Sequence, residues 1–268
     1  MRVNVGCELR FSSPAPVPLV AQVLPRTDDA HEILREERSA EPIDRSHEYE
    51  DAFGNRCWRI LAPAGDFSFR YDADVMITGQ PDPVVPEAMQ VPVEDLPDAL
   101  LAWTLPSRYI LSDVLGSTVW ELFGSVPPGW GRVQAICDWI HQHIQFRAAS
   151  TTPATTSLDV YHQRYGVCRD FAHLGITMCR ALNIPARYVF GYLPDIGIEP
   201  PDVPMDFHSW FEAYLGGKWY TFDARHNEPR IGRIPIGRGR DALDVAIVTQ
   251  YGASTLAGIS VWSDAVDA

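Results

Sequence analysis

Tyr165-Gly166-Val167-Cys168-Arg169-Asp170 opens the stretch of sequence that decides the fold. After it, apolar residues recur at steps of three and four, the spacing of one face of an amphipathic α-helix: Phe171, Leu174, Gly175, Met178, Cys179 and Leu182. Asn183 and Pro185 are signals that end a helix. The pattern therefore predicts a helix whose first turn carries Cys168, just after a glycine that lets the chain bend sharply.

A thiol in the first turn of a helix has particular chemistry available to it. The positive end of the helix dipole and the free backbone N–H groups favour its thiolate, and the same N–H groups can hold an oxyanion. Cys168 is therefore the candidate nucleophile, although most free cysteines are small buried apolar residues and its position alone leaves that alternative open. We interpret the other four as buried apolar residues: Cys7, Cys57, Cys137 and Cys179.

A β-hairpin further along the chain supplies a candidate base. Gly216-Gly217 separates residues 208–215 from residues 218–225, which is a strong hairpin signal. This turn makes His208 a diagonal neighbour of Asp223, roughly 7 Å away at the backbone. An aspartate that bonds one imidazole nitrogen leaves the other to act as a base, although the pair could equally be a structural contact between strands. Trp210 lies opposite Asp223 on the face of His208 and could wall a cleft or pack in the core.

The first third of the chain is β-rich. Alternating polar and apolar residues predict strands over 2–11, 57–61 and 67–77, separated by turn signals. We expect a small antiparallel β-sandwich, with residues 1–95 as its domain. The highly charged stretch 27–41 is expected to be a short surface helix or a mobile loop.

A change of pattern marks the second domain. Residues 79–98 contain five prolines, five acidic residues and no basic residue, which is typical of a linker. Helical spacing follows, over residues 112–123 and 128–144. We expect residues 96–268 to form an α+β core in which the helix of Cys168 packs against an antiparallel sheet.

Composition limits the classes of function. The 268 residues include 35 acidic and 22 basic ones, a net charge of −13, which disfavours nucleic acid and anionic membranes as partners. Five cysteines without C-x-x-C pairs fit neither a disulfide framework nor a zinc ribbon. His141 and His143 lie two apart on a predicted helix, so they cannot share a face as metal ligands. We expect a cytoplasmic protein without metal, cofactor or membrane segment.

Four segments in order carry a resemblance to a known family: residues 165–174, 182–192, 207–214 and 219–224. The chain resembles the bacterial transglutaminase-like family, whose members are thiol acyltransferases and hydrolases with a papain-like core, often after a β domain. The resemblance implies that Cys168 is the nucleophile, His208 the base and Asp223 the residue that orients it. One departure, Arg225-His226-Asn227 where proline, threonine and asparagine are common, is expected to matter little.

The expected reaction is acyl transfer from a peptide or protein amide through a Cys168 thioester. The backbone N–H of Cys168 is the better candidate for an oxyanion donor, with the Gln163 side chain as a weaker one. Three outcomes stay open: hydrolysis by a protease or amidase, crosslinking by an amine-accepting transglutaminase, and an inert core that binds peptides or assembles. The sequence does not decide among them.

Overall fold

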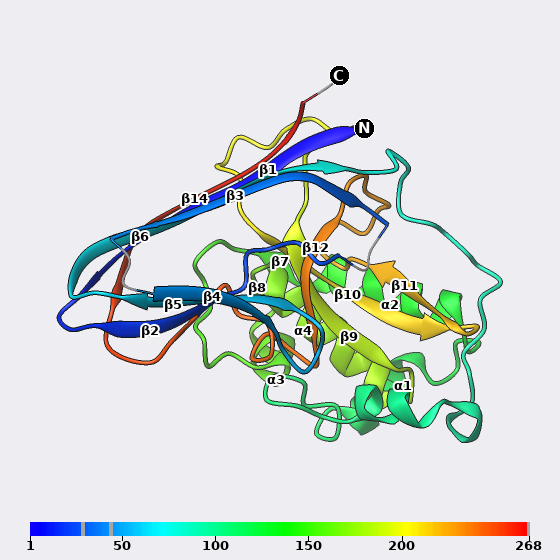
Figure 1. Ribbon diagram of the computed structural model, residues 1–268. Coiled ribbons are helices and arrows are strands. Elements are labelled where there is room, and N and C mark those ends of the chain that lie inside the picture. Colours follow the sequence, from blue (N-terminus) through cyan, green and yellow to red (C-terminus); the bar gives the residue numbers. More distant parts are fainter. Residues whose placement is uncertain (28–29, 43–44, 267–268) are drawn as a thin grey trace.

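The computed structural model describes residues 1–27, 30–42 and 45–266. Two four-stranded sheets, in the orders β14-β1-β6-β3 and β13-β2-β5-β4, form two layers on one side of the molecule (Figure 1). Their strands are β1 (Arg2–Ser13), β2 (Val17–Ala21), β3 (Glu32–Glu41), β4 (Arg45–Glu50), β5 (Arg56–Ala62), β6 (Gly65–Met76), β13 (Val248–Gln250) and β14 (Thr255–Ala265).

Alternation of side chains explains why these strands pair into a sandwich. Every second residue of the first half of β1 is buried, beginning with Val3 and Val5, so one face of the strand is apolar. Across the gap, the rings of Trp58 in β5 and Phe69 in β6 pack edge to face with centroids 5.8 Å apart. The predicted N-terminal β-sandwich is confirmed.

Two expectations for this region need correction. The stretch 27–41 is neither a helix nor a loop over most of its length, because β3 pairs with β6 as an edge strand; its residues 28 and 29 lie outside the described residues. Its many charges suit an exposed edge, and Glu36 binds the guanidinium of Arg56 at 2.8 Å. In addition, β13 and β14 pair with β2 and β1, so the end of the predicted second domain contributes strands to the sandwich. The boundary after residue 95 stays a prediction.

The second half of the chain builds a four-stranded antiparallel sheet, in the order β11-β10-β9-β12, against which helices pack. The helix α4, which begins at Cys168, contacts β10 and β9, as expected for the α+β core. The elements are η1 (Val93–Asp95), η2 (Asp98–Thr104), α1 (Gly116–Phe123), α2 (Trp130–His143), β7 (Gln145–Phe146), α3 (Ser157–Gln163), β8 (Tyr165–Gly166), α4 (Cys168–Ala181), β9 (Ala186–Tyr192), β10 (His208–Leu215), β11 (Lys218–Phe222) and β12 (Ile234–Gly239).

The hairpin β10–β11 has the predicted register. Leu215 pairs with Lys218 and Tyr214 with Trp219, so Gly216 and Gly217 form the turn, both with positive φ. A turn of this length leaves the strands one way to pair, and it brings the start of β10 beside the end of β11. This register is what places His208 near Asp223.

The connection between the two halves is extended but attached to the core. Three backbone hydrogen bonds hold it: Asp82 donates to Arg230, Trp130 donates to Ala88, and Gly216 donates to Met89, at 2.9, 2.8 and 2.7 Å. The predicted linker therefore runs along the surface of the α+β core. In the described part of the chain, no helix is long and apolar enough to cross a membrane.

Close packing of α4 on β10 depends on a glycine. A Cβ atom built on Gly175 would lie 2.5 Å from Cε1 of Phe211, which is fully buried in β10. We expect Gly175→Ala to lower the free energy of unfolding by ~1–3 kcal/mol, because the extra methyl overpacks the contact. Urea unfolding followed by circular dichroism measures the change.

Gly131→Ala in α2 is the matched control, because a Cβ atom added to Gly131 would meet no atom within 4 Å. That substitution should leave stability unchanged or raise it by up to ~1 kcal/mol through helix propensity. Equal effects of the two substitutions would contradict the tight packing of α4 on β10.

Candidate active site

A buried carboxylate organises the start of α4. Oδ2 of Asp170 accepts the backbone N–H of Val167 at 2.9 Å and the hydroxyl of Thr151 at 2.7 Å. The Asp170 side chain folds back so closely that a Cβ on Gly166 would lie 2.7 Å from its Cβ. Arg169 binds the other carboxylate oxygen at 2.9 Å. These contacts cap the start of the helix and fix the turn that presents Cys168.

Cys168 is the exception among the five cysteines. It is half-buried, whereas the other four are buried. Burial raises the pKa of the Cys168 thiol above its ordinary value, while the positive charge of Arg225 and hydrogen bonds from Ser209 lower it, and Asp206 raises it further. Burial therefore outweighs the effects of Arg225 and Ser209, and the net pKa shift runs opposite to the direction expected from the helix start.

His208 and Asp223 form the predicted pair. His208, the first residue of β10, places Nε2 2.7 Å from Oδ2 of Asp223, which follows the end of β11. Both side chains are buried. The contact is a short hydrogen bond in a low-dielectric setting, where such bonds are strong.

The second imidazole nitrogen has a partner that assigns the tautomer. Nη1 of Arg225 lies 3.5 Å from Nδ1 of His208. A guanidinium only donates hydrogen bonds, so we assign the lone pair to Nδ1 and the proton to Nε2, which donates it to Asp223. Nδ1 is therefore the atom that can accept a proton from a nucleophile.

Burial decides the charge state of this pair. It lowers the pKa of His208 to about 4, although the charge of Asp223 acts in the opposite direction. Burial alone would raise the pKa of Asp223, but the attraction of His208 and Arg233 and hydrogen bonds from both histidines hold it well below the ordinary value. At neutral pH the structure therefore holds a neutral imidazole beside an ionised carboxylate.

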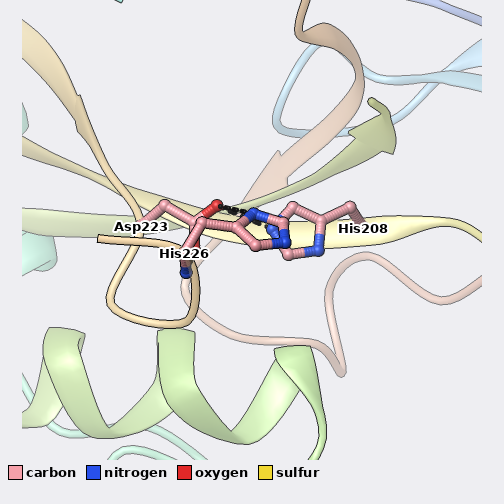
Figure 2. A group of neighbouring side chains, drawn as sticks. All are labelled: His208, Asp223 and His226. Atoms are coloured by element: carbon pink, nitrogen blue, oxygen red, sulfur yellow. Dashed lines mark hydrogen bonds and ion pairs between the residues drawn. The ribbon is translucent and has the colours of Figure 1, made fainter. Parts of the chain in front are cut away.

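A second histidine shares the same carboxylate oxygen. Nδ1 of His226 lies 3.1 Å from Oδ2 of Asp223, and its ring centroid is 4.6 Å from that of His208. Figure 2 shows both imidazoles beside the carboxylate. Arg233 approaches the same oxygen at 3.1 Å and binds Asp82 at 2.7 Å. One oxygen of this buried carboxylate, Oδ2, therefore meets three cationic or N–H groups.

These side chains also form a set of possible metal donors. One nitrogen each of His208 and His226 and one oxygen of Asp223 all lie within 4.8 Å of one another. Two imidazoles and a carboxylate are common ligands of transition metals. Here the guanidinium of Arg233 places a positive charge on the oxygen that a cation would need, so the arrangement fits a hydrogen-bonded pair better than a metal site.

The departure Arg225-His226-Asn227 was expected to matter little, but the structure places two of its residues against the His208–Asp223 pair. Asn227, in the left-handed region with φ 56°, donates its side chain to Asp138 of α2 at 2.8 Å. Only one sequence signal pointed to His226, namely its spacing of three residues after Asp223 across a turn.

The two weaker site candidates have other partners in the structure. The Gln163 amide, at the end of α3, donates to the carbonyl of Tyr165 at 2.9 Å. Trp210 is 1% exposed, and its ring stacks on His208 with centroids 6.1 Å apart. The ring thus packs against His208. Oxyanion binding by Gln163 and substrate binding by Trp210 stay predictions.

Comparison with known proteins agrees with this fold. Residues 121–224 match the profile of the transglutaminase-like superfamily. A crystal structure from Cytophaga hutchinsonii, provisionally assigned as a cysteine protease, is 33% identical with a TM-score of 0.90 and is matched over 100% of this chain and 91% of that chain. This chain belongs to the transglutaminase-like superfamily.

Two mycobacterial relatives are similar in sequence. An uncharacterized protein of Mycobacterium leprae is 28% identical over 257 residues, which cover 92% of this chain and 90% of that protein. An uncharacterized protein of Mycobacterium tuberculosis is 34% identical over 118 residues, which cover 40% of this chain and 37% of that protein. The similarity to the first of these relatives therefore includes the β-sandwich as well as the core.

The raised pKa of Cys168 predicts how its alkylation depends on pH. The thiolate is the reactive form, so the iodoacetamide rate at Cys168 should rise by about tenfold per unit between pH 6 and pH 8. Mass spectrometry of timed samples measures this rate and compares it with those of the buried Cys137 and Cys179, which should be slower at every pH. A rate at Cys168 that is constant over this range would contradict the neutral thiol and indicate a preformed thiolate.

Proposed function

We propose that the protein is a cysteine-dependent enzyme that cleaves a peptide or protein amide through a thioester on Cys168. In the first step the Cys168 thiol gives its proton to Nδ1 of His208, and Sγ forms a bond to the amide carbonyl carbon. His208 then passes that proton to the leaving amine as the C–N bond breaks. A water molecule, deprotonated at the same nitrogen, attacks the thioester and releases the acid and the thiol.

The observation that carries this proposal is the orientation of His208. Its Nε2 is bonded to Asp223 at 2.7 Å, and its Nδ1 is left as an acceptor. Two neighbours are common to His208 and Cys168: Ser209, the next residue in β10, bonds the thiol, and Arg225 contacts Nδ1 and acts on the thiol charge. A base in a defined tautomer and a half-buried thiol that share two neighbours support nucleophilic catalysis.

The resting charge state supports a role for the substrate in starting the reaction. Burial raises the pKa of Cys168 and lowers that of His208, so both groups are neutral in the free protein. Proton transfer then becomes favourable as Sγ bonds to the carbonyl and the charge moves to the oxygen. The backbone N–H of Cys168, which has no acceptor within its own helix, is our proposed donor to that oxyanion.

Water is our proposed acyl acceptor, in line with the provisional assignment of the Cytophaga hutchinsonii relative as a cysteine protease. A crosslinking transglutaminase would use a primary amine at the same step. Partition of the thioester between water and added glycine methyl ester, followed by mass spectrometry of the acyl products, separates the two reactions. Amide products in excess of acid at low amine concentration would contradict hydrolysis as the main reaction.

Paired action of His208 and Asp223 is testable by substitution. His208→Ala should abolish nearly all turnover of a peptide anilide, and Asp223→Asn should lower kcat by ~10²–10⁴, because the imidazole loses its orientation and tautomer. Since both residues serve one proton transfer, the double variant should be scarcely slower than His208→Ala. Circular dichroism and thermal unfolding check that each variant folds.

His162→Ala is the matched control, because His162 is an exposed histidine of α3. It should keep wild-type turnover. Independent, multiplying losses in the double variant would show that Asp223 does not act through His208. The absence of a trapped thioester in wild-type protein with any peptide tested would favour an inert binding module.

A further inference from the structure

The Arg225 guanidinium contacts Nδ1 of His208, the atom that would accept the proton of Cys168. Its Nη1 lies 3.5 Å from Nδ1 of His208, and its Cζ lies 3.8 Å from the ring centroid of Phe146. The Arg225 side chain is half-buried. In the free protein, a cation therefore sits where the proton of Cys168 must arrive.

Hydrogen bonds hold the backbone around Arg225 in place, and its side chain reaches the site. Oδ1 of Asp223 accepts the N–H groups of Arg225 and His226 at 3.1 and 3.3 Å. His141 of α2 bonds the Arg225 carbonyl at 3.0 Å, and Gln134 bonds the Asn227 side chain at 2.8 Å. The loop is thus attached to both Asp223 and α2, and only the guanidinium is free to change partners.

That guanidinium lacks an anionic partner. No carboxylate lies within ion-pair distance of Arg225 in residues 1–27, 30–42 and 45–266. Desolvation raises the pKa of Asp206, and the charge of Arg225 acts in the opposite direction, but the two side chains do not form an ion pair. In a protein of net charge −13, a cation left unpaired beside the nucleophile is a feature that needs an anion to complete it.

We propose that Arg225 recognises a carboxylate on the acyl donor, so that the enzyme prefers acidic acyl groups and is activated by them. This inference rests on the proposed function, because it assigns the substrate class of the same site. A planar guanidinium binds a carboxylate through two parallel hydrogen bonds, which are stronger than its single long contact with an imidazole nitrogen.

Binding of such a carboxylate changes the base as well as holding the substrate. When Arg225 pairs with the carboxylate, its N–H leaves Nδ1 of His208, and the lone pair becomes available to the thiol. The carboxylate also neutralises a positive charge that disfavours the imidazolium formed during the proton transfer. Binding of the substrate carboxylate by Arg225 therefore also activates His208 as a base.

Two alkylating reagents test the charge preference at Cys168. Iodoacetate carries a carboxylate and iodoacetamide is its neutral counterpart; in both, Sγ displaces iodide. We expect the iodoacetate-to-iodoacetamide rate ratio at Cys168 to exceed that of N-acetylcysteine amide by about tenfold, the scale of one charge-assisted contact. Arg225→Gln should reduce the ratio to that of the small thiol, and Arg225→Lys should keep part of the preference.

The matched control is Arg59→Gln, which removes the same charge from an exposed position in β5. It should keep the wild-type ratio, so a loss in Arg225→Gln cannot be an effect of net charge. A ratio in Arg225→Gln equal to that of wild type overturns the inference while Cys168 remains a reactive thiol. Failure of both reagents to label Cys168 overturns the proposed function itself, and the inference with it.

Turnover gives an independent reading of the same preference. Glutaryl and butyryl 4-nitroanilides have acyl chains that differ in a terminal carboxylate. The wild-type kcat/KM should favour the glutaryl donor by about tenfold. Arg225→Gln should abolish that preference by lowering glutaryl turnover, while butyryl turnover is kept or raised because no cation then holds Nδ1 of His208. Equal losses for the two donors would make Arg225 a structural residue and overturn its role in recognition.

Discussion

The structure of the site depends on one buried negative charge, the carboxylate of Asp223. A carboxylate removed from water is costly unless hydrogen bonds and cations compensate it, and here its pKa lies well below the ordinary range. His208, His226 and Arg233 meet at one oxygen, and two backbone N–H groups of the following loop meet at the other. Arg233 also binds Asp82. The Asp223 carboxylate therefore links three segments: the hairpin, the loop after β11, and the connection between the two halves of the chain.

A second buried carboxylate performs the same task for the nucleophile. Asp170 is fully buried, and it binds the backbone before α4, the hydroxyl of Thr151 and the guanidinium of Arg169. The two halves of the proposed reaction are therefore positioned by separate anions, one on the helix and one on the hairpin. The packing of Gly175 against Phe211 then determines how the helix and the sheet meet.

Local rules explain how much could be predicted from the sequence. The helix of Cys168 follows from its apolar periodicity, and the His208–Asp223 pair follows from the two-glycine turn, because turn length determines strand register.

The strand β3 could not be recognised, because an exposed, charged edge strand lacks the apolar alternation of a buried one. The positions of Arg225 and His226 depend on a loop held by α2, through contacts between residues 84 and 89 positions apart in the chain, and no local pattern reports such a contact. The direction of the Cys168 pKa shift was missed because burial, which only the tertiary structure reveals, is its largest cause.

A neutral thiol and a neutral imidazole are states of low reactivity, and burial, partial for the Cys168 residue and complete for the imidazole, favours both. Such a site gains selectivity if only the correct substrate restores the proton transfer. Arg225 is suited to that role because it contacts the base, acts on the charge of the thiol and is only half-buried. An uncharged residue in its place would leave Nδ1 open at all times, and the nucleophile would then react with any carbonyl that fits. The departure of this loop from the pattern common in the family is therefore the part of the site in which substrate choice and activation can be joined.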